Sequence, residues 1–335
     1  MEKFSQFRDK GSGIAPFLPI PPEPKGVALP FHIFLYVCRV PLLLFFCIAY
    51  FAFFQFLPFG VLGRKASLWC ILGIPGIWWI DLQIDGVKKG SLAQHSARLP
   101  KAGSIIASTY NSPIDALYLA AIFDPIFAAS YPNTRLVQPL TLFQATIRAF
   151  SSPSSQVQAP PNAKLVDVST YLAQNPNRVM VLFPECTTSN GRGTLPLSPC
   201  LLAASSRTKV HPVHLRYTPA DITTPIPHAY GTFLWNLCSR PTHCIRIRIA
   251  EAVQNSAQNH AASLKASALD SIADSASDAE TLVGTEEDGP QTQEERIFLD
   301  KISEALARLG RIKRVGLGVK EKGDFVDMWT KKKRS

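Results

Sequence analysis

Short apolar runs alternate with helical patterns along the middle of the chain, and this predicts an α/β domain. Five runs rich in β-branched or alternating apolar residues indicate strands at 81–87, 104–108, 178–183, 209–215 and 244–249. Between them, helical patterns occur at 115–122 and 164–172. Because strands and helices alternate, we expect a layered α/β domain over residues 81–250.

The segment that precedes this domain is far more apolar. Residues 40–62 hold no charged side chain, and a helix of this length covers about 34 Å, enough for a hydrocarbon core of about 30 Å. The next apolar stretch, 67–80, is too short to span a bilayer, and its tryptophans suit the headgroup level. We therefore predict one or more membrane segments within 28–80, as a span or as a re-entrant hairpin. A buried helical pair in a soluble core is the alternative.

The remaining segments differ from the domain in composition. Residues 1–27 are polar and rich in proline, which predicts a flexible arm. Residues 251–293 are rich in Ser, Ala and acidic side chains and contain no aromatic residue, so a disordered insertion is expected. Residues 294–335 carry a single apolar stripe among basic residues, which predicts a basic amphipathic C-terminal helix and tail.

Charge and cysteine content narrow the class of partner. The net charge is +10 although 251–293 holds eight acidic residues and one lysine, so the rest of the chain is strongly basic. Such a surface fits nucleic acid or anionic lipid. No nucleic-acid module signature is present, and the apolar segment favours a membrane. The seven cysteines have no paired spacing, which indicates reduced thiols in the cytosol and predicts no metal site.

The most specific chemical pattern is FPECTTSNG at 183–191, which follows a predicted strand. A loop at the carboxyl end of a strand is where α/β folds place binding groups. Its carboxylate and hydroxyls suit a polyol such as glycerol phosphate. A strand-to-turn connection with hydrogen-bonding side chains is the alternative interpretation of the composition alone.

This pattern resembles the FPEGTTSNG block of 1-acylglycerol-3-phosphate acyltransferases, with Cys186 where that block has glycine. About 70 residues upstream, TYNSPID at 109–115 resembles the NHxSxxD block of the same family. Downstream, His211-Pro212-Val213 resembles the family's fourth block. The resemblance implies an acyltransferase-type domain that acylates lysophosphatidic acid or a related lysophospholipid in glycerolipid synthesis. Acyl-CoA would be the co-substrate, with no further cofactor.

The resemblance also implies roles for single residues. In the family, a histidine deprotonates the lysolipid hydroxyl and the motif aspartate, here Asp115, orients that histidine. Glu185 would bond a glycerol hydroxyl, and an arginine, Arg148 or else Arg192, would hold the lysolipid phosphate. The implied catalytic set is Tyr110, Ser112 and Asp115, and the implied substrate-binding set is Pro184, Glu185, Thr187, Thr188, Gly191 and Arg148.

The chain departs from the family pattern at one position, because Tyr110 stands where the histidine is expected. An unperturbed tyrosine has a pKa of about 10 against about 6.5 for histidine, so it is a poor base at neutral pH. His211 or His214 would be a replacement base only if the fold brought it to the motif. Two further interpretations stay open: a catalytically weak or inactive relative that binds lipid or acts as a scaffold, and a basic RNA-binding protein.

Two smaller features concern location and reactivity. Lysines 332 and 333 stand fourth and third from the end, as in dilysine retrieval signals, which favours an endoplasmic-reticulum membrane with the domain facing the cytosol. A hairpin anchor would also suit the monolayer of a lipid droplet. Cys186 is interpreted either as a reactive thiol or, more simply, as a small buried residue.

Overall fold

The computed structural model describes residues 2–22, 26–55, 60–87, 92–255 and 292–334. Within these residues, eight strands form one sheet in the order β1-β8-β7-β2-β5-β3-β4, with β9 added to β7. Most pairs are parallel, whereas β8 and β9 run antiparallel to β7, and β4 to β3. The strands are β1 (Asp81–Ile84), β2 (Ile105–Ser108), β3 (Ile126–Ala129), β4 (Gln138–Leu140), β5 (Met180–Leu182), β7 (Lys209–Thr218), β8 (Cys244–Ile249) and β9 (Val253–Gln254).

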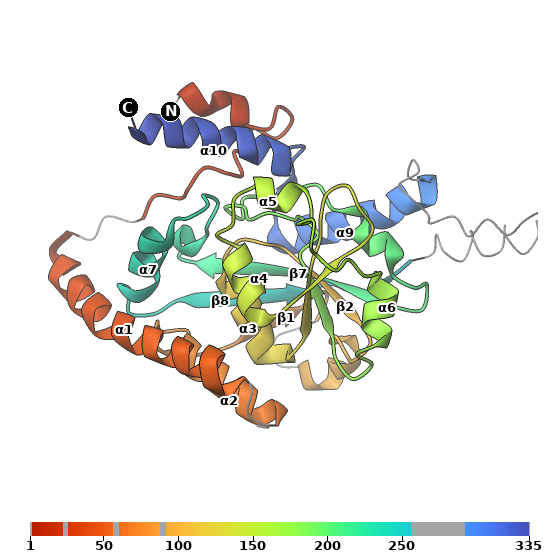
Figure 1. Cartoon of the computed structure of the whole chain (residues 1–335), viewed down its shortest axis with the longest axis horizontal. Helices are drawn as coiled ribbons and strands as arrows, with labels where there is room; N and C mark the ends of the chain where they lie inside the picture. Colours follow the sequence, from red (N-terminus) through yellow and green to blue (C-terminus); the bar gives the residue numbers. More distant parts are fainter. Residues whose placement is uncertain (1, 23–25, 56–59, 88–91, 256–291, 335) are drawn as a thin grey trace, which may run out of the picture.

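Helices cover both faces of this sheet, and the predicted α/β class is confirmed (Figure 1). The α-helices are α1 (Leu29–Ala49), α2 (Val61–Gly73), α3 (Ile114–Phe123), α4 (Leu142–Arg148), α5 (Ser154–Val157), α6 (Val168–Ala173), α7 (Tyr230–Cys238), α9 (Gln293–Gly310) and α10 (Val319–Arg334). Shorter 3₁₀- or π-helical segments are η1 (Glu2–Phe7), η2 (Gly26–Ala28), η3 (Tyr50–Phe54), η4 (Leu92–Arg98), η5 (Pro199–Ala203) and η6 (Ala220–Ile222). In a second, two-stranded sheet, β6 (Gly193–Thr194) pairs with β10 (Lys313–Arg314).

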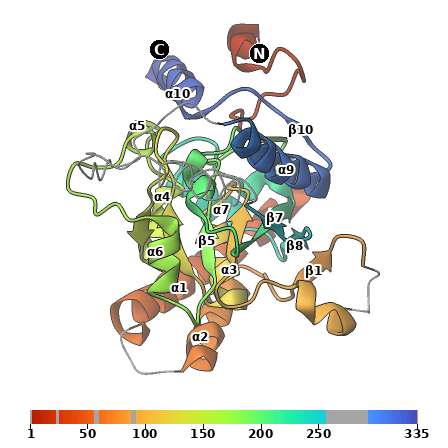
Figure 2. The same cartoon turned by 90° about the vertical axis from the view of Figure 1, so that its right-hand side faces the viewer.

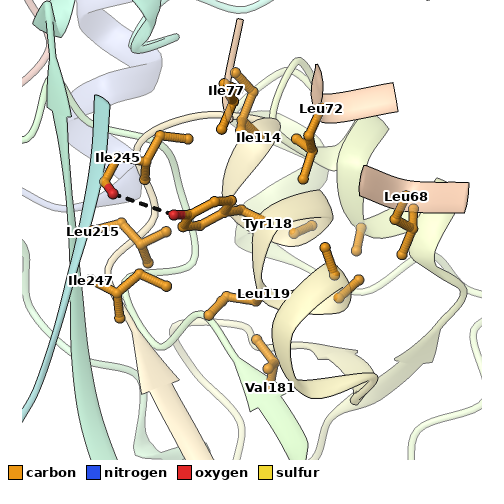
Figure 3. Close-up of a cluster of buried hydrophobic side chains, with 14 of the residues drawn as sticks. Leu68, Leu72, Ile77, Ile114, Tyr118, Leu119, Val181, Leu215, Ile245 and Ile247 are labelled. Carbon is orange, nitrogen blue, oxygen red and sulfur yellow. Dashed lines mark hydrogen bonds between the residues drawn. The ribbon is translucent and has the colours of Figure 1, made fainter. Parts of the chain in front are cut away.

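The alternation of side chains in the central strands divides the core into two layers. In β2, Ile106 points to a cluster with α3, whereas Ile105 and Ala107 point to a cluster with α6 and α9. Figure 3 shows the first layer, where Tyr118 of α3 lies among leucine and isoleucine side chains and donates a hydrogen bond to the Ile245 carbonyl at 3.4 Å. Both faces of β2 and β5 are therefore buried, as parallel strands require.

The predicted strands are all present, and β8 has the predicted bounds. The sequence prediction missed β3 and β4. β3 follows α3 after only two residues, Asp124 and Pro125, and its four residues are a short apolar run that continues the apolar composition of the helix. β4 contains Pro139 and lies at the sheet edge, where a strand that lacks one N–H donor is tolerated.

The apolar helix lies earlier in the chain than predicted. α2 follows residues 26–54 as a separate helix, so the predicted segment 40–62 includes residues of both helices. Residues 26–54 form a continuous helical stretch whose most apolar 18-residue window has a mean hydropathy of 2.2. Only 11% of its most apolar window is buried. A helix in a soluble core would be buried along its length, so the exposure argues against the soluble alternative.

One face of α1 contacts the domain along much of its length. Arg39 donates to the carbonyls of Arg240 and Pro241, and the Tyr36 ring lies 5.0 Å from that of Trp235 in α7. Further along, Tyr50 is buried against the first core layer. These contacts extend over about 20 Å of helix, so α1 lies against the side of the domain rather than projecting from it (Figure 1).

The N-terminal arm is packed rather than flexible, which corrects the prediction for residues 1–27 where the structure describes them. Phe4, Phe7 and Phe17 are buried, and each ring contacts Phe325 of α10 with centroid distances of 5.3 to 6.2 Å. Figures 1 and 2 show η1 beside α10 at one end of the molecule. The local sequence does not reveal these contacts because the partner helix lies about 300 residues away.

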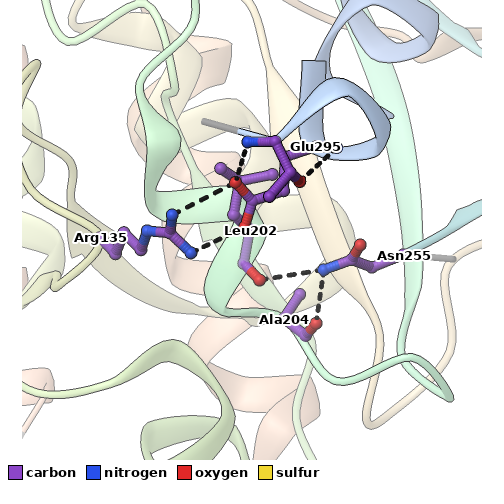
Figure 4. Close-up of polar contacts among 6 residues, drawn as sticks. Arg135, Leu202, Ala204, Asn255 and Glu295 are labelled. Carbon is purple, nitrogen blue, oxygen red and sulfur yellow. Dashed lines mark hydrogen bonds and ion pairs between the residues drawn. The ribbon is translucent and has the colours of Figure 1, made fainter. Parts of the chain in front are cut away.

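The acidic insertion predicted at 251–293 lies mainly outside the described residues, and both of its flanks belong to the fold. Its first residues form β9, and the Asn255 amide donates to the carbonyls of Leu202 and Ala204. On the other side, Glu295 at the start of α9 forms a bidentate ion pair with Arg135, at 2.8 and 3.2 Å (Figure 4). The predicted amphipathic C-terminal helix is present as α9, followed by α10.

Candidate active site

The two motif segments follow adjacent parallel strands. β2 ends at Ser108 and β5 at Leu182, so the residues after them meet at one edge of the sheet. The Glu185 carboxylate accepts from the Tyr110 backbone N–H at 3.0 Å, and the Ser189 N–H donates to the Tyr110 carbonyl at 3.0 Å. Ser189 also donates its hydroxyl to Asn111. The structure thus joins the two patterns that the sequence singled out.

Asp115 lies in the first turn of α3 and is completely buried. Its Oδ2 accepts from the N–H groups of Asn111 and Ser112, at 2.6 and 2.8 Å, and its Oδ1 accepts from the Tyr217 hydroxyl. Burial raises the pKa of Asp115 to about 7, although hydrogen bonds from Tyr217, Asn111 and Ser112 lower it. The carboxylate therefore accepts hydrogen bonds from the backbone of its own motif loop and from the Tyr217 hydroxyl of β7.

The Tyr110 side chain, where the resemblance implies a histidine, makes no hydrogen bond to Asp115. Its side chain is 1% exposed, and its ring stacks on Phe183 with centroids 4.4 Å apart. The hydroxyl donates to the Ala145 carbonyl in α4 at 3.3 Å rather than to Asp115. Burial raises the pKa of Tyr110 further above its ordinary value. The phenol thus stays protonated at neutral pH and cannot serve as a general base.

Tyr217 bonds Asp115 instead, and the sequence analysis did not identify it. It belongs to β7, on the same face as Val213 and Leu215, and it is buried in the first core layer. Burial and the charge of Asp115 both raise its pKa. The predicted strand ended at residue 215. Extending the apolar alternation by two residues would have placed Tyr217 on the face that meets α3.

Glu185 is the second buried carboxyl group of the site. Its Oε2 accepts from Tyr110 N–H, and its Oε1 accepts from Leu195 N–H at 3.0 Å. Burial raises the pKa of Glu185 to about 8, against the hydrogen bonds that lower it. The carboxyl thus links the two motif loops through backbone donors, in addition to any role toward a substrate hydroxyl.

Cys186 occupies a backbone conformation that favours glycine. Its φ is +61°, in the left-handed region, and this explains why a glycine fits at this position without steric cost. The side chain is buried, with Sγ 3.4 Å from the Ser130 hydroxyl. Burial raises the pKa of the thiol to about 11. These observations support the interpretation of Cys186 as a small buried residue rather than a reactive thiol.

The remaining motif residues hold the loop in place. The Thr187 hydroxyl donates to Gln156 Oε1 at 2.5 Å, and the Thr188 hydroxyl donates to the Thr224 carbonyl at 2.6 Å. Gly191 has a φ of +71°, which allows the turn. Two further contacts fix neighbouring segments: Ser112 Oγ donates to the Ile222 carbonyl, and the Pro184 carbonyl accepts from Ser198 N–H.

Arg148 lies at the end of α4, close to both motifs. Its guanidinium carbon is 4.8 Å from the centre of the Tyr131 ring, and Nη2 donates to the Ser130 carbonyl at 3.3 Å. It lines a small cavity together with Tyr110 and Cys186. Arg192, the other candidate, is exposed at the far end of the motif loop. The geometry thus favours Arg148 as the cation of the site.

His214 of β7 does not lie beside Asp115. His214 faces α9, since a Cβ atom at Gly310 would lie 2.6 Å from its Nε2. Asp115 meets the sheet from the α3 side, so His214 lies on the opposite face. Burial lowers the pKa of both His211 and His214 to about 4. Both side chains therefore remain neutral at physiological pH.

Lys322 completes the polar contacts of the motif loop, and sequence reasoning assigned it only to a basic helix. Its ammonium donates to the hydroxyls of Thr187 and Thr188 and to the Thr188 carbonyl, at 2.7 to 2.9 Å. A lysine on an amphipathic helix is expected to face solvent, so the local pattern contained no signal for this contact.

Comparison with known proteins gives two relatives. The chain is 30% identical over 236 residues to a protein of Schizosaccharomyces pombe named, provisionally, as a lysophosphatidic acid:oleoyl-CoA acyltransferase, covering 68% of this chain and 77% of that protein. It is 27% identical over 210 residues to lysophosphatidic acid:oleoyl-CoA acyltransferase 1 of Saccharomyces cerevisiae, covering 59% and 61%. No family model and no solved structure matches the chain. The first alignment extends over three quarters of its relative, and the chain therefore belongs to the lysophospholipid acyltransferase family of these two proteins.

Proposed function

We propose that the protein transfers the acyl group of an acyl-CoA to the free hydroxyl of lysophosphatidic acid, as the names of its two relatives state for those proteins. In this reaction the hydroxyl oxygen attacks the thioester carbon, the C–O ester bond forms and the C–S bond breaks. The hydroxyl proton passes, directly or through a base, to the sulfur of the departing coenzyme A. The observation that carries the proposal is the junction of the two motif loops through Glu185 and the Tyr110 backbone.

In this proposal, Asp115 is the carboxylate beside the reacting hydroxyl. Tyr110 stands at the position of the family's histidine but is protonated and bonded to Ala145. General base catalysis contributes about 10²- to 10⁴-fold, so its absence predicts slow turnover. Positioning of the two substrates would supply the remaining acceleration.

An inactive, lipid-binding relative is the second candidate, and the orientation of Tyr110 favours it. The buried phenol turns toward α4, whereas Asp115 is fully engaged by two backbone donors and Tyr217. A protein that only holds the lipid would need the loops and the phosphate-binding cation but not a base. The two candidates therefore predict different turnover, but both predict that the site binds the phosphate of the lipid.

Arg148 supplies the test of the proposed function, with Arg192 as its matched control. We expect Arg148→Met to raise the KM for lysophosphatidic acid about 10- to 100-fold, because a hydrogen bond to a charged group contributes about 1.5 to 3 kcal/mol. Arg192→Met should stay close to wild type because its side chain is exposed. The measurement is transfer of labelled oleoyl-CoA to lysophosphatidic acid in vesicles.

The wild-type protein decides between the two candidates in the same assay. Slow but measurable formation of phosphatidic acid supports the enzyme. Saturable binding of lysophosphatidic acid that Arg148→Met weakens, with no ester formed from any acyl-CoA, would leave the lipid-binding relative. Equal loss in both arginine variants would show that Arg148 has no special relation to the phosphate.

We further propose that α1 and α2 attach the protein to a membrane as a hairpin within one leaflet. The lateral contacts of α1 with the domain support this arrangement, because a helix crossing the bilayer would draw polar domain surface into hydrocarbon. Exposed Trp78 and Trp79 follow α2 and suit the headgroup level. The cytosolic face of the endoplasmic reticulum, or a lipid droplet, is the proposed location, on the basis of the lysine-rich tail.

Ile48 and Ile297 form a matched pair for the membrane proposal, since both side chains are exposed, one on α1 and one on α9. Replacing an apolar residue with aspartate in a membrane segment costs about 3 kcal/mol, or about 100-fold in partitioning. We expect Ile48→Asp to reduce the fraction that floats with phosphatidylcholine vesicles and Ile297→Asp to leave it unchanged. Equal flotation of both variants would contradict attachment through α1.

A further inference from the structure

Lys322 is a buried cation that the proposed reaction does not use. It lies on α10 and is 1% exposed. Three oxygen acceptors surround its ammonium: Thr187 Oγ1 at 2.9 Å, the Thr188 carbonyl at 2.7 Å and Thr188 Oγ1 at 2.9 Å. Within the part of the chain that the structure describes, no carboxylate pairs with it. Burying an ammonium without a counter-charge is costly, so an apolar side chain would serve better if α10 needed only packing.

The contacts of Lys322 continue toward Arg148. Thr187 accepts from Lys322 and donates to Gln156 Oε1 at 2.5 Å. Gln156 is completely buried, and its Nε2 donates to the Arg148 backbone carbonyl at 3.0 Å. The end of α4 that carries the Arg148 guanidinium is thus tied through two side chains to the ammonium of α10. Displacing that ammonium would leave the oxygen atoms of Thr187 and Thr188 without its N–H donors, and Thr187 is the residue that orients Gln156.

The N-terminal arm accepts hydrogen bonds from the other end of the motif loop 183–191. Asn190 donates its side-chain amide to the carbonyls of Ala15 and Leu18, both at 2.8 Å, and its backbone N–H to the Pro16 carbonyl at 2.8 Å. The arm in turn packs its phenylalanines on Phe325, one turn along α10 from Lys322. The arm and α10 therefore enclose the motif loop together, and Lys322 is the residue of α10 that bonds to it.

We propose that Lys322 is a positioning residue for acyl transfer, which holds the Thr187–Gln156–Arg148 contacts in the arrangement that binds the lysolipid phosphate. This inference rests on the proposed function, and it makes α10 part of the proposed active site. It does not require Lys322 to touch substrate, because all three of its N–H donors already have protein acceptors. Burial lowers the pKa of Lys322 to about 7, which agrees with the absence of a counter-charge.

The test compares Lys322→Met with Lys320→Met in the full-length protein in phosphatidylcholine vesicles. Both changes remove one positive charge from α10, but the Lys320 side chain is exposed. We expect Lys322→Met to raise the KM for lysophosphatidic acid about 10-fold or more and to leave the KM for oleoyl-CoA within about twofold. Lys320→Met should leave both values at wild type. A fall in kcat alone, or equal behaviour of the two variants, would overturn the inference.

Two further variants separate positioning from a loss of folded protein. Lys322→Arg keeps a donor cation and should recover part of the lysolipid KM. Thr187→Val removes the link to Gln156 and should reproduce the effect of Lys322→Met, and the double variant should be no worse than either single one because both break the same path. Additive effects, or activity lost only in proportion to the unfolded fraction seen by thermal denaturation, would contradict the inference.

Failure of the inference can be told apart from failure of the proposed function. If wild type forms no phosphatidic acid, the enzyme proposal fails before any variant is compared. If wild type is active and Lys322→Met matches Lys320→Met in every constant, only the positioning role is lost.

Discussion

Replacing Asp115 with alanine is expected to abolish acyl transfer and to lower the free energy of unfolding by about 3 to 9 kcal/mol. The change leaves two backbone N–H groups and the Tyr217 hydroxyl without their acceptor at a completely buried position. Each buried donor left unsatisfied costs about 1 to 3 kcal/mol. Denaturant unfolding and acyl transfer measured on the same preparation check both parts of the prediction.

Asp115→Asn is the control that separates a loss of catalysis from a loss of folding stability. The asparagine oxygen can accept from the two N–H groups, and its amide can donate to the Tyr217 oxygen. We therefore expect stability within about 1.5 kcal/mol of wild type, with transfer still lost because the negative charge is gone. An asparagine variant that transfers acyl groups at the wild-type rate would show that Asp115 only holds the loop.

The pH dependence gives a third readout of Asp115. Because burial raises its pKa to about 7, the carboxylate forms as the pH rises through this value, and transfer by wild type should rise with it. Stability changes in the opposite direction. A folded-state pKa above the unfolded value contributes stability that is present below about pH 4 and is lost as the pH rises through about 7.

Much of the framework was predictable because it depends on local patterns. The buried runs of β2, β5 and β8 exclude polar residues on at least one face, and the loops after β2 and β5 carry the motif residues. Parallel pairing then dictates that the segments after β2 and β5 meet. Asp115 and Glu185 are singled out by the resemblance of their segments to the family blocks, and the junction between their loops is present in the structure.

The features that escaped prediction depend on distant contacts. Lys322 has the surroundings of a solvent-facing lysine in its own helix, and only the position of α10 over the motif loop buries it. Phe4 and Phe17 lie in a proline-rich arm whose composition suggests disorder, yet they pack on Phe325. The orientation of Tyr110 is also set by its surroundings, because Phe183 and Ala145 determine where the ring lies.

Placing a histidine at position 110 is expected to raise kcat about 10²- to 10⁴-fold, provided that Asp115 is free to accept a hydrogen bond from the imidazole. In the present structure Tyr217 already donates to Oδ1 of Asp115, and Oδ2 is taken by two N–H groups. An imidazole at 110 would therefore compete with the Tyr217 hydroxyl for Oδ1. Tyr217→Phe removes this competitor, so the full gain is expected in Tyr110→His/Tyr217→Phe and a smaller gain in Tyr110→His alone.

Two single variants control for changes in packing. Tyr110→Phe keeps the stack on Phe183 and loses only the 3.3 Å hydrogen bond to Ala145, so it should turn over like wild type if the phenol has no chemical role. Tyr217→Phe alone should not increase kcat, since it supplies no base. Single-turnover transfer of oleoyl-CoA is measured for the four variants and the wild type. If the double variant is no faster than wild type, the slow step is not deprotonation, and the tyrosine at 110 then marks a site shaped to hold lipid rather than to acylate it.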